Sequence, residues 1–311
     1  MTRQKLSGLI PQAYEHPTDA AALNALASSK AFAELVAKLN EWSFERIVRV
    51  QLTGSYLRVS RDNFPDLHRT LTTSCDLLDL PLQPDLYIAP GHINALTVGV
   101  KQPLILVYSD AVDLLTPEEL LFVIAHEVGH IKSGHVLYYQ IAEFLPRIGE
   151  MFGAVTLGLG ELFGAGLSLA LLHWKRMAEF TADRAGLLAC QDGEVAVGAL
   201  MKLAGLPAKY YETMNTEDFM AQAKSFRALD EDKVSKVAKW LSALEASHPW
   251  TVMRAHELLG WIDAKGYEAV LRKPTAVAGG ACYCMHCGSK LVGNESFCLR
   301  CGHALERRAV G

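Results

Sequence analysis

The segment His126-Glu127-Val128-Gly129-His130 constrains this chain more than any other feature of its sequence. On an α-helix, two histidines four residues apart lie on one face, so both imidazoles can bind a single zinc ion. The glutamate between them can then face the water on that ion. The pattern is typical of zinc-dependent peptide hydrolysis, but it is short. Its weight depends on whether neighbouring residues form the helix and supply a third ligand.

The preceding residues predict the start of that helix. Thr116 can cap it, Pro117 fits the first helical position, where no amide donor is needed, and Glu119 completes a capping box. Gly129 disfavours the helix by about 1 kcal/mol relative to alanine, which indicates the close approach of a neighbouring strand or of the substrate. We expect a buried helix, because apolar residues recur at helical spacing: Leu120, Leu121, Ile124, Val128 and Ile131.

The third ligand is expected further along the chain. Glu179 and Asp183 lie one helical turn apart, so both can point at the same site. Catalytic zinc commonly takes three protein ligands, and a set of two histidines and one glutamate is a standard composition. We therefore predict that Glu179 completes the site. Asp183 is expected to accept the free ring N–H of a ligating histidine and so to orient it.

His135 is a rival third ligand. The metzincin pattern requires a glycine three residues and a histidine six residues after the second histidine of the motif. Those positions are Ser133 and Val136 here, and Gly134 and His135 are out of register. We therefore reject His135 as the third zinc ligand.

Together these motifs resemble the HtpX-like and CAAX-prenyl-protease family of gluzincin zinc metallopeptidases. The resemblance rests on Leu115-Thr116-Pro117-Glu118-Glu119-Leu120, on the two-histidine motif with His135 behind it, and on the helix that carries Glu179 and Asp183. It covers about residues 60 to 265. It implies an α+β, predominantly helical zincin-type metallopeptidase domain with a small β-sheet.

Two further sequence segments resemble those of the same family. Asn94-Ala95 precedes the active-site helix, and the resemblance implies a strand there that lines the cleft and pairs with an extended substrate. His248, followed by Pro249, and Arg254 are implied to approach the zinc. We expect one of them to stabilise the oxyanion that develops during catalysis. The alternative is that His248 only caps a helix before Pro249.

The expected activity is that of a zinc-dependent metalloendopeptidase acting on proteins or peptides. Zinc lowers the pKa of its bound water from 15.7 to about 7, and Glu127 takes the proton as that water attacks the scissile carbonyl. Glu127 can then return the proton to the leaving amine. Two alternatives stay open: a catalytically weak zinc-binding scaffold, which has no need of Glu127, and a regulatory adaptor that acts through the C-terminal cysteines.

Those cysteines form two CxxCG motifs, which resemble a zinc ribbon: Cys284, Cys287, Cys298 and Cys301. Paired thiolates of this kind close a tetrahedral structural zinc site, and the metal would supply most of the folding energy of so short a stretch. The alternative is a pair of disulfides, which requires an oxidising compartment. Cys282 is expected to be a bystander. Cys75 and Cys190 lie among apolar residues and are expected to be inert core thiols.

The chain divides into four predicted regions. Residues 1–60 form helices and a hairpin of 48–52 with 56–59, residues 61–272 form the peptidase domain, and 273–281 link it to a ribbon at 282–303. Ser28 and Ser29 are possible caps of an N-terminal helix. Within the peptidase domain the patterns predict a helix near 65–78 and strands at 86–89, 95–98 and 104–108.

Composition sets the expected location and partners. The formal charge of −4 provides no electrostatic reason to expect nucleic-acid binding, and residues 1–15 contain no secretory h-region, so the default location is cytoplasmic. Residues 151–172 are long and apolar enough to span a bilayer, but Glu161 lies among them. We expect this segment to fold back beside the active site, with peripheral membrane contact at most.

Overall fold

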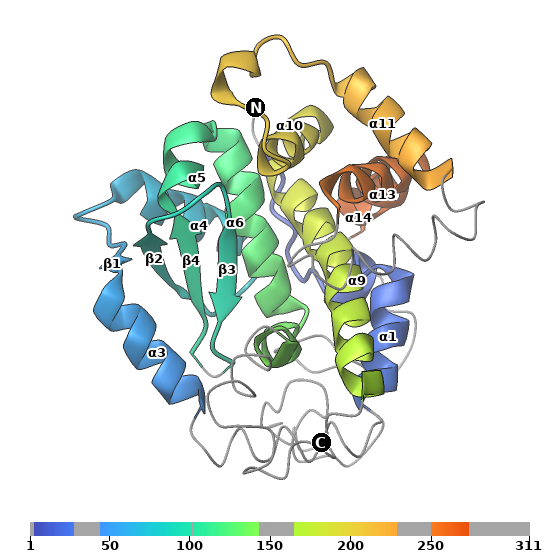
Figure 1. Ribbon diagram of the computed structural model, residues 1–311. Helices are drawn as coiled ribbons and strands as arrows, with labels where there is room; N and C mark the ends of the chain where they lie inside the picture. The colour runs from blue at the N-terminus through green and yellow to red at the C-terminus, as the bar shows by residue number, and fades with distance from the viewer. Residues whose placement is uncertain (1–2, 28–43, 101, 143–164, 229–249, 274–311) are drawn as a thin grey trace.

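A small mixed β-sheet lies beside a larger group of helices (Figure 1). The computed structural model describes residues 3–27, 44–100, 102–142, 165–228 and 250–273. The sheet has the strand order β1-β2-β4-β3, in which β2 and β4 are parallel and the other two pairs are antiparallel. Its strands are β1 (Leu57–Arg58), β2 (Asp85–Ala89), β3 (Ala95–Val98) and β4 (Leu104–Tyr108). The three strands predicted from sequence are thereby confirmed.

The helices account for most of the described chain. The predicted helix near residue 65 is confirmed as α4. Two short 3-10 helices, η1 (Pro11–Ala13) and η2 (Ala208–Tyr210), accompany the α-helices. The α-helices include α1 (Pro17–Ala27), α3 (Phe44–Ser55), α4 (Pro65–Leu77), α5 (Ser109–Leu114), α6 (Pro117–Lys132), α9 (Ala165–Cys190), α10 (Gly193–Leu203), α11 (Thr216–Ala228), α13 (Thr251–Asp263) and α14 (Gly266–Arg272). Residues 136–142 are also helical.

Helix α6 lies at the centre of the molecule, between the sheet and α9, and α1 runs along α9 on its other side (Figure 1). The main core gathers buried side chains from α4, α6, α9 and α10. Leu6, Leu9 and Tyr14 belong to this same core, so the described N-terminal residues pack directly on the domain that carries the two-histidine motif.

The hairpin predicted for residues 48–59 is wrong. Residues 44–55 form α3, and Leu57–Arg58 pairs with β2 instead. A short run with apolar residues at every second position also has apolar residues four apart, so period alone does not decide between strand and helix. Tertiary contacts decide here, because Arg49 Nη2 binds Asp85 Oδ2 at 2.5 Å and Leu52 packs against the apolar face of the sheet.

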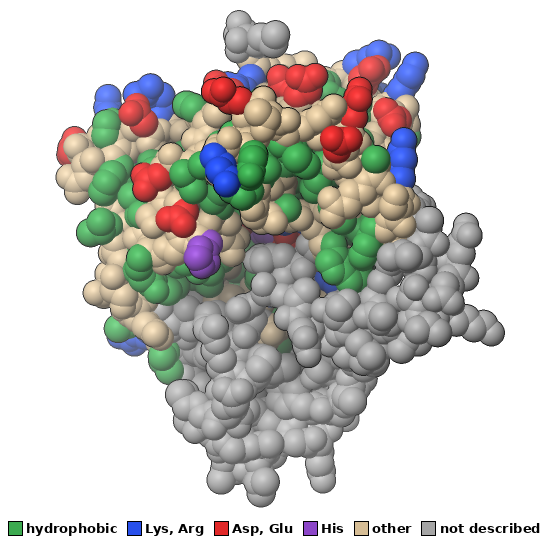
Figure 2. Space-filling model, turned by 45° about the horizontal axis from the view of Figure 1, so that its top comes forward, with side chains coloured by type: hydrophobic (Ala, Val, Ile, Leu, Met, Phe, Trp, Pro, Cys, Tyr) green, Lys and Arg blue, Asp and Glu red, His purple; other side chains and the backbone are tan. Residues whose placement is uncertain are grey.

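Several sequence predictions fall on residues that are not described. Ser28, Ser29, His248 and the ribbon cysteines lie outside the described residues, as do 151–164. Residues 165–172 form the first part of α9. Among the described helices, none combines the length and the apolar character that a membrane span requires. On the face shown in Figure 2, acidic and basic side chains are interspersed with apolar ones.

Candidate metal centre and active site

The helix that carries the two-histidine motif begins where the sequence predicts. The Thr116 amide donates to Glu119 Oε2 at 2.7 Å and the Glu119 amide donates to Thr116 Oγ1 at 3.3 Å, which completes the capping box. Lys202 of α10 also binds Glu119 Oε2, at 2.7 Å in the protein interior. The cap therefore anchors α6 at its N-terminus, and the residues from Glu119 to Lys132 are buried.

The helix ends in a turn that returns the chain toward the motif. Gly134 has a φ of +70°, and its amide donates to the Ile131 carbonyl, while the His135 amide donates to the His130 carbonyl. This is a Schellman motif, in which a residue in the left-handed region closes the last helical turn. Its consequence is that the side chain of His135 lies against that of His130.

Helices α6 and α9 pack closely because each has a glycine that faces a side chain of the other helix. A Cβ atom at Gly129 would lie 2.5 Å from Ala185 Cβ, and one at Gly186 would lie 2.8 Å from the Phe122 ring. The close neighbour indicated by Gly129 is therefore α9 rather than a strand or a substrate. This contact brings the two-histidine motif next to Glu179 and Asp183.

Three side chains converge at this crossing. The Nε2 atoms of His126 and His130 are 3.2 Å apart, and each lies 3.5 Å from a different carboxylate oxygen of Glu179. Tetrahedral zinc with bonds of about 2.0–2.1 Å requires ligand atoms about 3.3 Å apart. The two nitrogens are thus about one tetrahedron edge apart, and each has a carboxylate oxygen of Glu179 at a similar distance. All three side chains are buried, and one ligand atom from each lies within 4.8 Å of the others.

Asp183 and Arg254 surround the first histidine. Asp183 Oδ1 lies 2.9 Å from His126 Nδ1, and Arg254 donates to both carboxylate oxygens of Asp183, at 2.8 and 2.5 Å. A third nitrogen of Arg254 lies 3.2 Å from Glu179. Arg254, which we expected beside the developing oxyanion, thus holds two carboxylates of the site.

The pKa shifts of these side chains follow from their contacts. Burial opposes the charge on His126, but hydrogen bonds and charges from Asp183 and Glu179 raise its pKa to about 9. Burial lowers the pKa of His130. Burial also opposes the charged form of Asp183, but the guanidinium of Arg254 outweighs it and lowers the pKa of that carboxyl.

One hydrogen bond to Glu127 and one to Glu179 were not predicted from the sequence. Thr97 of β3 donates from Oγ1 to Glu127 Oε2 at 2.6 Å, and the hydroxyl of Tyr139 donates to Glu179 Oε1 at 3.2 Å. Thr97 lies two residues after Ala95 on the predicted strand, and that spacing places both on one face. The alternation of the strand could therefore have indicated Thr97.

A small cavity of about 20 Å³ adjoins these groups. A water molecule needs about 10–15 Å³ of such space, so the cavity matches one small molecule beside Glu127. Asn94 and Ala95, expected to line the substrate cleft, are among its walls. It is lined by Asn94, Ala95, Phe122, Val123, His126, Glu127, Glu179, Leu203 and Arg254.

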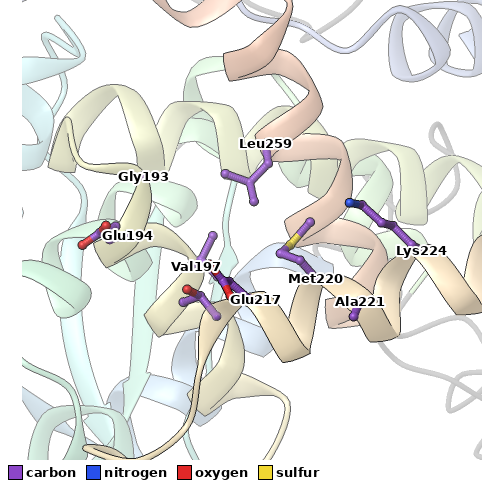
Figure 3. A pocket seen from close by; sticks show the side chains of 9 residues that line it. Gly193, Glu194, Val197, Glu217, Met220, Ala221, Lys224 and Leu259 are labelled. Carbon is purple, nitrogen blue, oxygen red and sulfur yellow. The ribbon is translucent and has the colours of Figure 1, made fainter.

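A larger cavity of about 430 Å³ lies between α10, α11 and α13. The side chains of Val197, Met220 and Leu259, one from each helix, converge there (Figure 3). It shares no lining residue with the small cavity at His126. Of these two cavities, only the small one adjoins the converging side chains of His126 and Glu179.

Comparison with known proteins places this geometry in context. The profile described as "Peptidase family M48" matches residues 61–262. Over 233 residues, or 74% of the chain, the sequence is 34% identical to "Plastoglobule-localized metallopeptidase 48, chloroplastic" of Arabidopsis thaliana. Over 178 residues, or 50% of the chain, it is 30% identical to "Protease HtpX homolog 2" of Methanosarcina mazei. These matches span 66% and 60% of the two relatives, less than two thirds of each. No solved structure gave a significant match.

Proposed function

Because the chain belongs to peptidase family M48, we propose that it is a zinc-dependent endopeptidase that hydrolyses peptide bonds of protein or peptide substrates. The resemblance to HtpX-like metallopeptidases that the motifs indicated is confirmed by this membership. The observation that carries the proposal is the convergence of His126, His130 and Glu179, whose ligand atoms lie within 4.8 Å of one another and make up a standard set of zinc ligands.

Each residue has a role in this proposal. His126, His130 and Glu179 would hold the zinc, which when bound lowers the pKa of a water molecule and polarises the scissile carbonyl. Glu127 accepts the proton of the attacking water and delivers it to the leaving amine. Thr97 holds the Glu127 carboxylate through its hydrogen bond.

Asp183 and Arg254 act on the ligands. Asp183 orients His126 through Nδ1, and Arg254 in turn holds Asp183 and Glu179 in place. Arg254 is therefore proposed as a positioning residue. His248, which lies outside the described residues, is the remaining proposed donor to the oxyanion.

Strand β3 is the proposed substrate-binding edge. In the described sheet it pairs only with β4, and it follows Asn94 at the wall of the small cavity. An extended peptide can add to such an edge through main-chain hydrogen bonds. Recognition would then depend mainly on the substrate backbone, so methylation of a substrate amide beside the scissile bond should raise KM.

Two further expectations belong to the same proposal. The cysteine pairs at 284–287 and 298–301 are proposed to bind a structural zinc ion. Residues 151–172 are proposed to contact a membrane peripherally, from a cytoplasmic location. One relative carries a plastoglobule location in its name, which describes that protein.

The decisive experiment compares Glu127→Gln with Glu179→Ala. Glu127→Gln should retain the zinc and lose at least about two orders of magnitude in peptide hydrolysis, the typical contribution of a general base. Glu179→Ala should lose one equivalent of zinc. Glu118→Gln is the matched control, because Glu118 lies on the same helix with a side chain 52% exposed. Near-normal turnover by zinc-loaded Glu127→Gln would refute Glu127 as the base. Absence of hydrolysis by the zinc-loaded wild-type protein would refute the proposed activity and favour the scaffold.

A further inference from the structure

A chain of buried polar groups leads from His130 away from the small cavity. His130 Nδ1 lies 3.0 Å from His135 Nδ1, and His135 Nε2 lies 3.0 Å from Asp19 Oδ2. His135 and Asp19 are fully buried, with 0% exposure. Asp19 belongs to α1, which precedes residues 61–262 that the family profile matches. A residue outside that region therefore reaches the proposed metal site.

Asp19 accepts two hydrogen bonds whose direction is certain. Trp174 Nε1 donates to Asp19 Oδ1 at 2.9 Å, and Thr181 Oγ1 donates to Asp19 Oδ2 at 2.5 Å. The indole N–H can only donate, and an ionised carboxylate can only accept. Both donors lie on α9, so α1 and α9 are joined at the same carboxylate that faces His135.

These contacts fix the position of each ring proton, if the metal site is the one proposed above. When His130 binds zinc through Nε2, its single proton must lie on Nδ1, because a neutral imidazole carries one N–H. That N–H then donates to His135 Nδ1. The proton of His135 must consequently lie on Nε2, which is 3.0 Å from Asp19 Oδ2, a distance of close charge contact without the geometry of a hydrogen bond.

We propose that Asp19 is a positioning residue that selects the tautomers of His135 and His130 and so strengthens zinc binding. The two histidine ligands are then supported alike, because the Nδ1 side of each leads to a buried carboxylate. For His126 that carboxylate is Asp183, in direct contact. For His130 it is Asp19, acting through His135. Supporting contacts of this kind are worth about 10- to 100-fold in metal affinity.

Asp19→Asn provides a sharp test because the shape of the side chain is kept. Trp174 Nε1 needs an acceptor, so the amide oxygen of asparagine must occupy the Oδ1 position. The amide NH₂ then faces His135 Nε2 and requires that atom to accept. His135 must donate from Nδ1, and His130 can accept only if its own proton moves to Nε2, the atom that binds zinc.

The expected result is a zinc affinity about 10- to 100-fold weaker in Asp19→Asn, measured by chelator competition on the folded full-length protein. The affinity to be measured is that of the zinc ion which the Glu179→Ala variant loses. Asp192→Ala is the control, because it removes the side-chain cap of α10 without touching the site and should lower thermal stability alone. Wild-type zinc affinity in Asp19→Asn would overturn the proposal, whatever its thermal stability.

A second measurement needs no variant. Long-range ¹H–¹⁵N NMR of the zinc-loaded wild-type protein should place a proton on Nε2 of His135 and on Nδ1 of His130. The donor atoms of Glu15, Asp19 and His135 also lie within 4.8 Å of one another. A cation there, or a proton on Nδ1 of His135, would overturn the inference. If Glu179→Ala retained its zinc, the zinc site of the proposed function, on which this inference rests, would be refuted instead.

Discussion

Gly129→Ala tests whether the crossing of α6 and α9 sets the geometry of the site. A Cβ atom at this position would lie 2.5 Å from Ala185 Cβ, whereas carbon atoms pack best at about 3.5–4.0 Å. The two helices must therefore separate by about 1 Å or more. One of them carries His126 and His130 and the other carries Glu179, so the separation pulls the three ligands apart.

The magnitude follows from two opposing effects. Alanine favours the helix by about 1 kcal/mol over glycine, whereas overpacking a core contact costs about 1–3 kcal/mol. The free energy of unfolding should consequently fall by at most about 2 kcal/mol. Activity should fall much further, because a displacement of about 1 Å in an active site can reduce the rate about 100-fold.

The assay pairs chemical unfolding of the zinc-loaded protein with peptide hydrolysis. Gly260→Ala is the matched control, because Gly260 is helical and nothing lies within 4 Å of the position that a Cβ atom would take there; it should gain stability and keep activity. In Gly129→Ala/Ala185→Gly the next neighbour of the new Cβ is at 3.5 Å, an ordinary contact, so activity should return. Full activity in the single variant, or none regained in the double, would refute the reasoning.

Three further predictions concern the base, the cysteines and the apolar segment. Thr97→Val should lower kcat about 10- to 100-fold with the zinc content unchanged, and Thr97→Ser should restore it; an equal loss in both would contradict a role for the hydroxyl. The intact chain should contain two zinc ions, and truncation after Pro274 should leave one with peptidase activity largely kept; an inactive truncation would make the ribbon part of the catalytic unit. Carbonate extraction should release the protein into the supernatant, and retention in the membrane pellet would contradict peripheral contact through residues 151–172.

The helix of the active site could be predicted from the sequence because its determinants lie within a few residues of one another. Thr116 and Glu119 form the predicted capping box, and the histidines four apart lie on one helical face as the pitch requires. The strands β2, β3 and β4 are similarly marked by local patterns. The pairing of the histidines with Glu179 was also predictable, because zinc accepts few sets of ligands.

Tertiary structure decided which distant residues support the site. Nothing near Asp19 in the sequence indicates His135, and the contact exists because α1 packs along α9. Arg254 likewise reaches Asp183 only through the placement of α13. The alternating pattern around Val50 allowed both strand and helix, and contacts of its neighbours with the sheet selected the helix. Helix caps and the spacing of apolar residues are set within one or two helical turns, so a local sequence pattern shows them. The contacts of Asp19 and Arg254 depend on how whole helices pack, which no local pattern encodes.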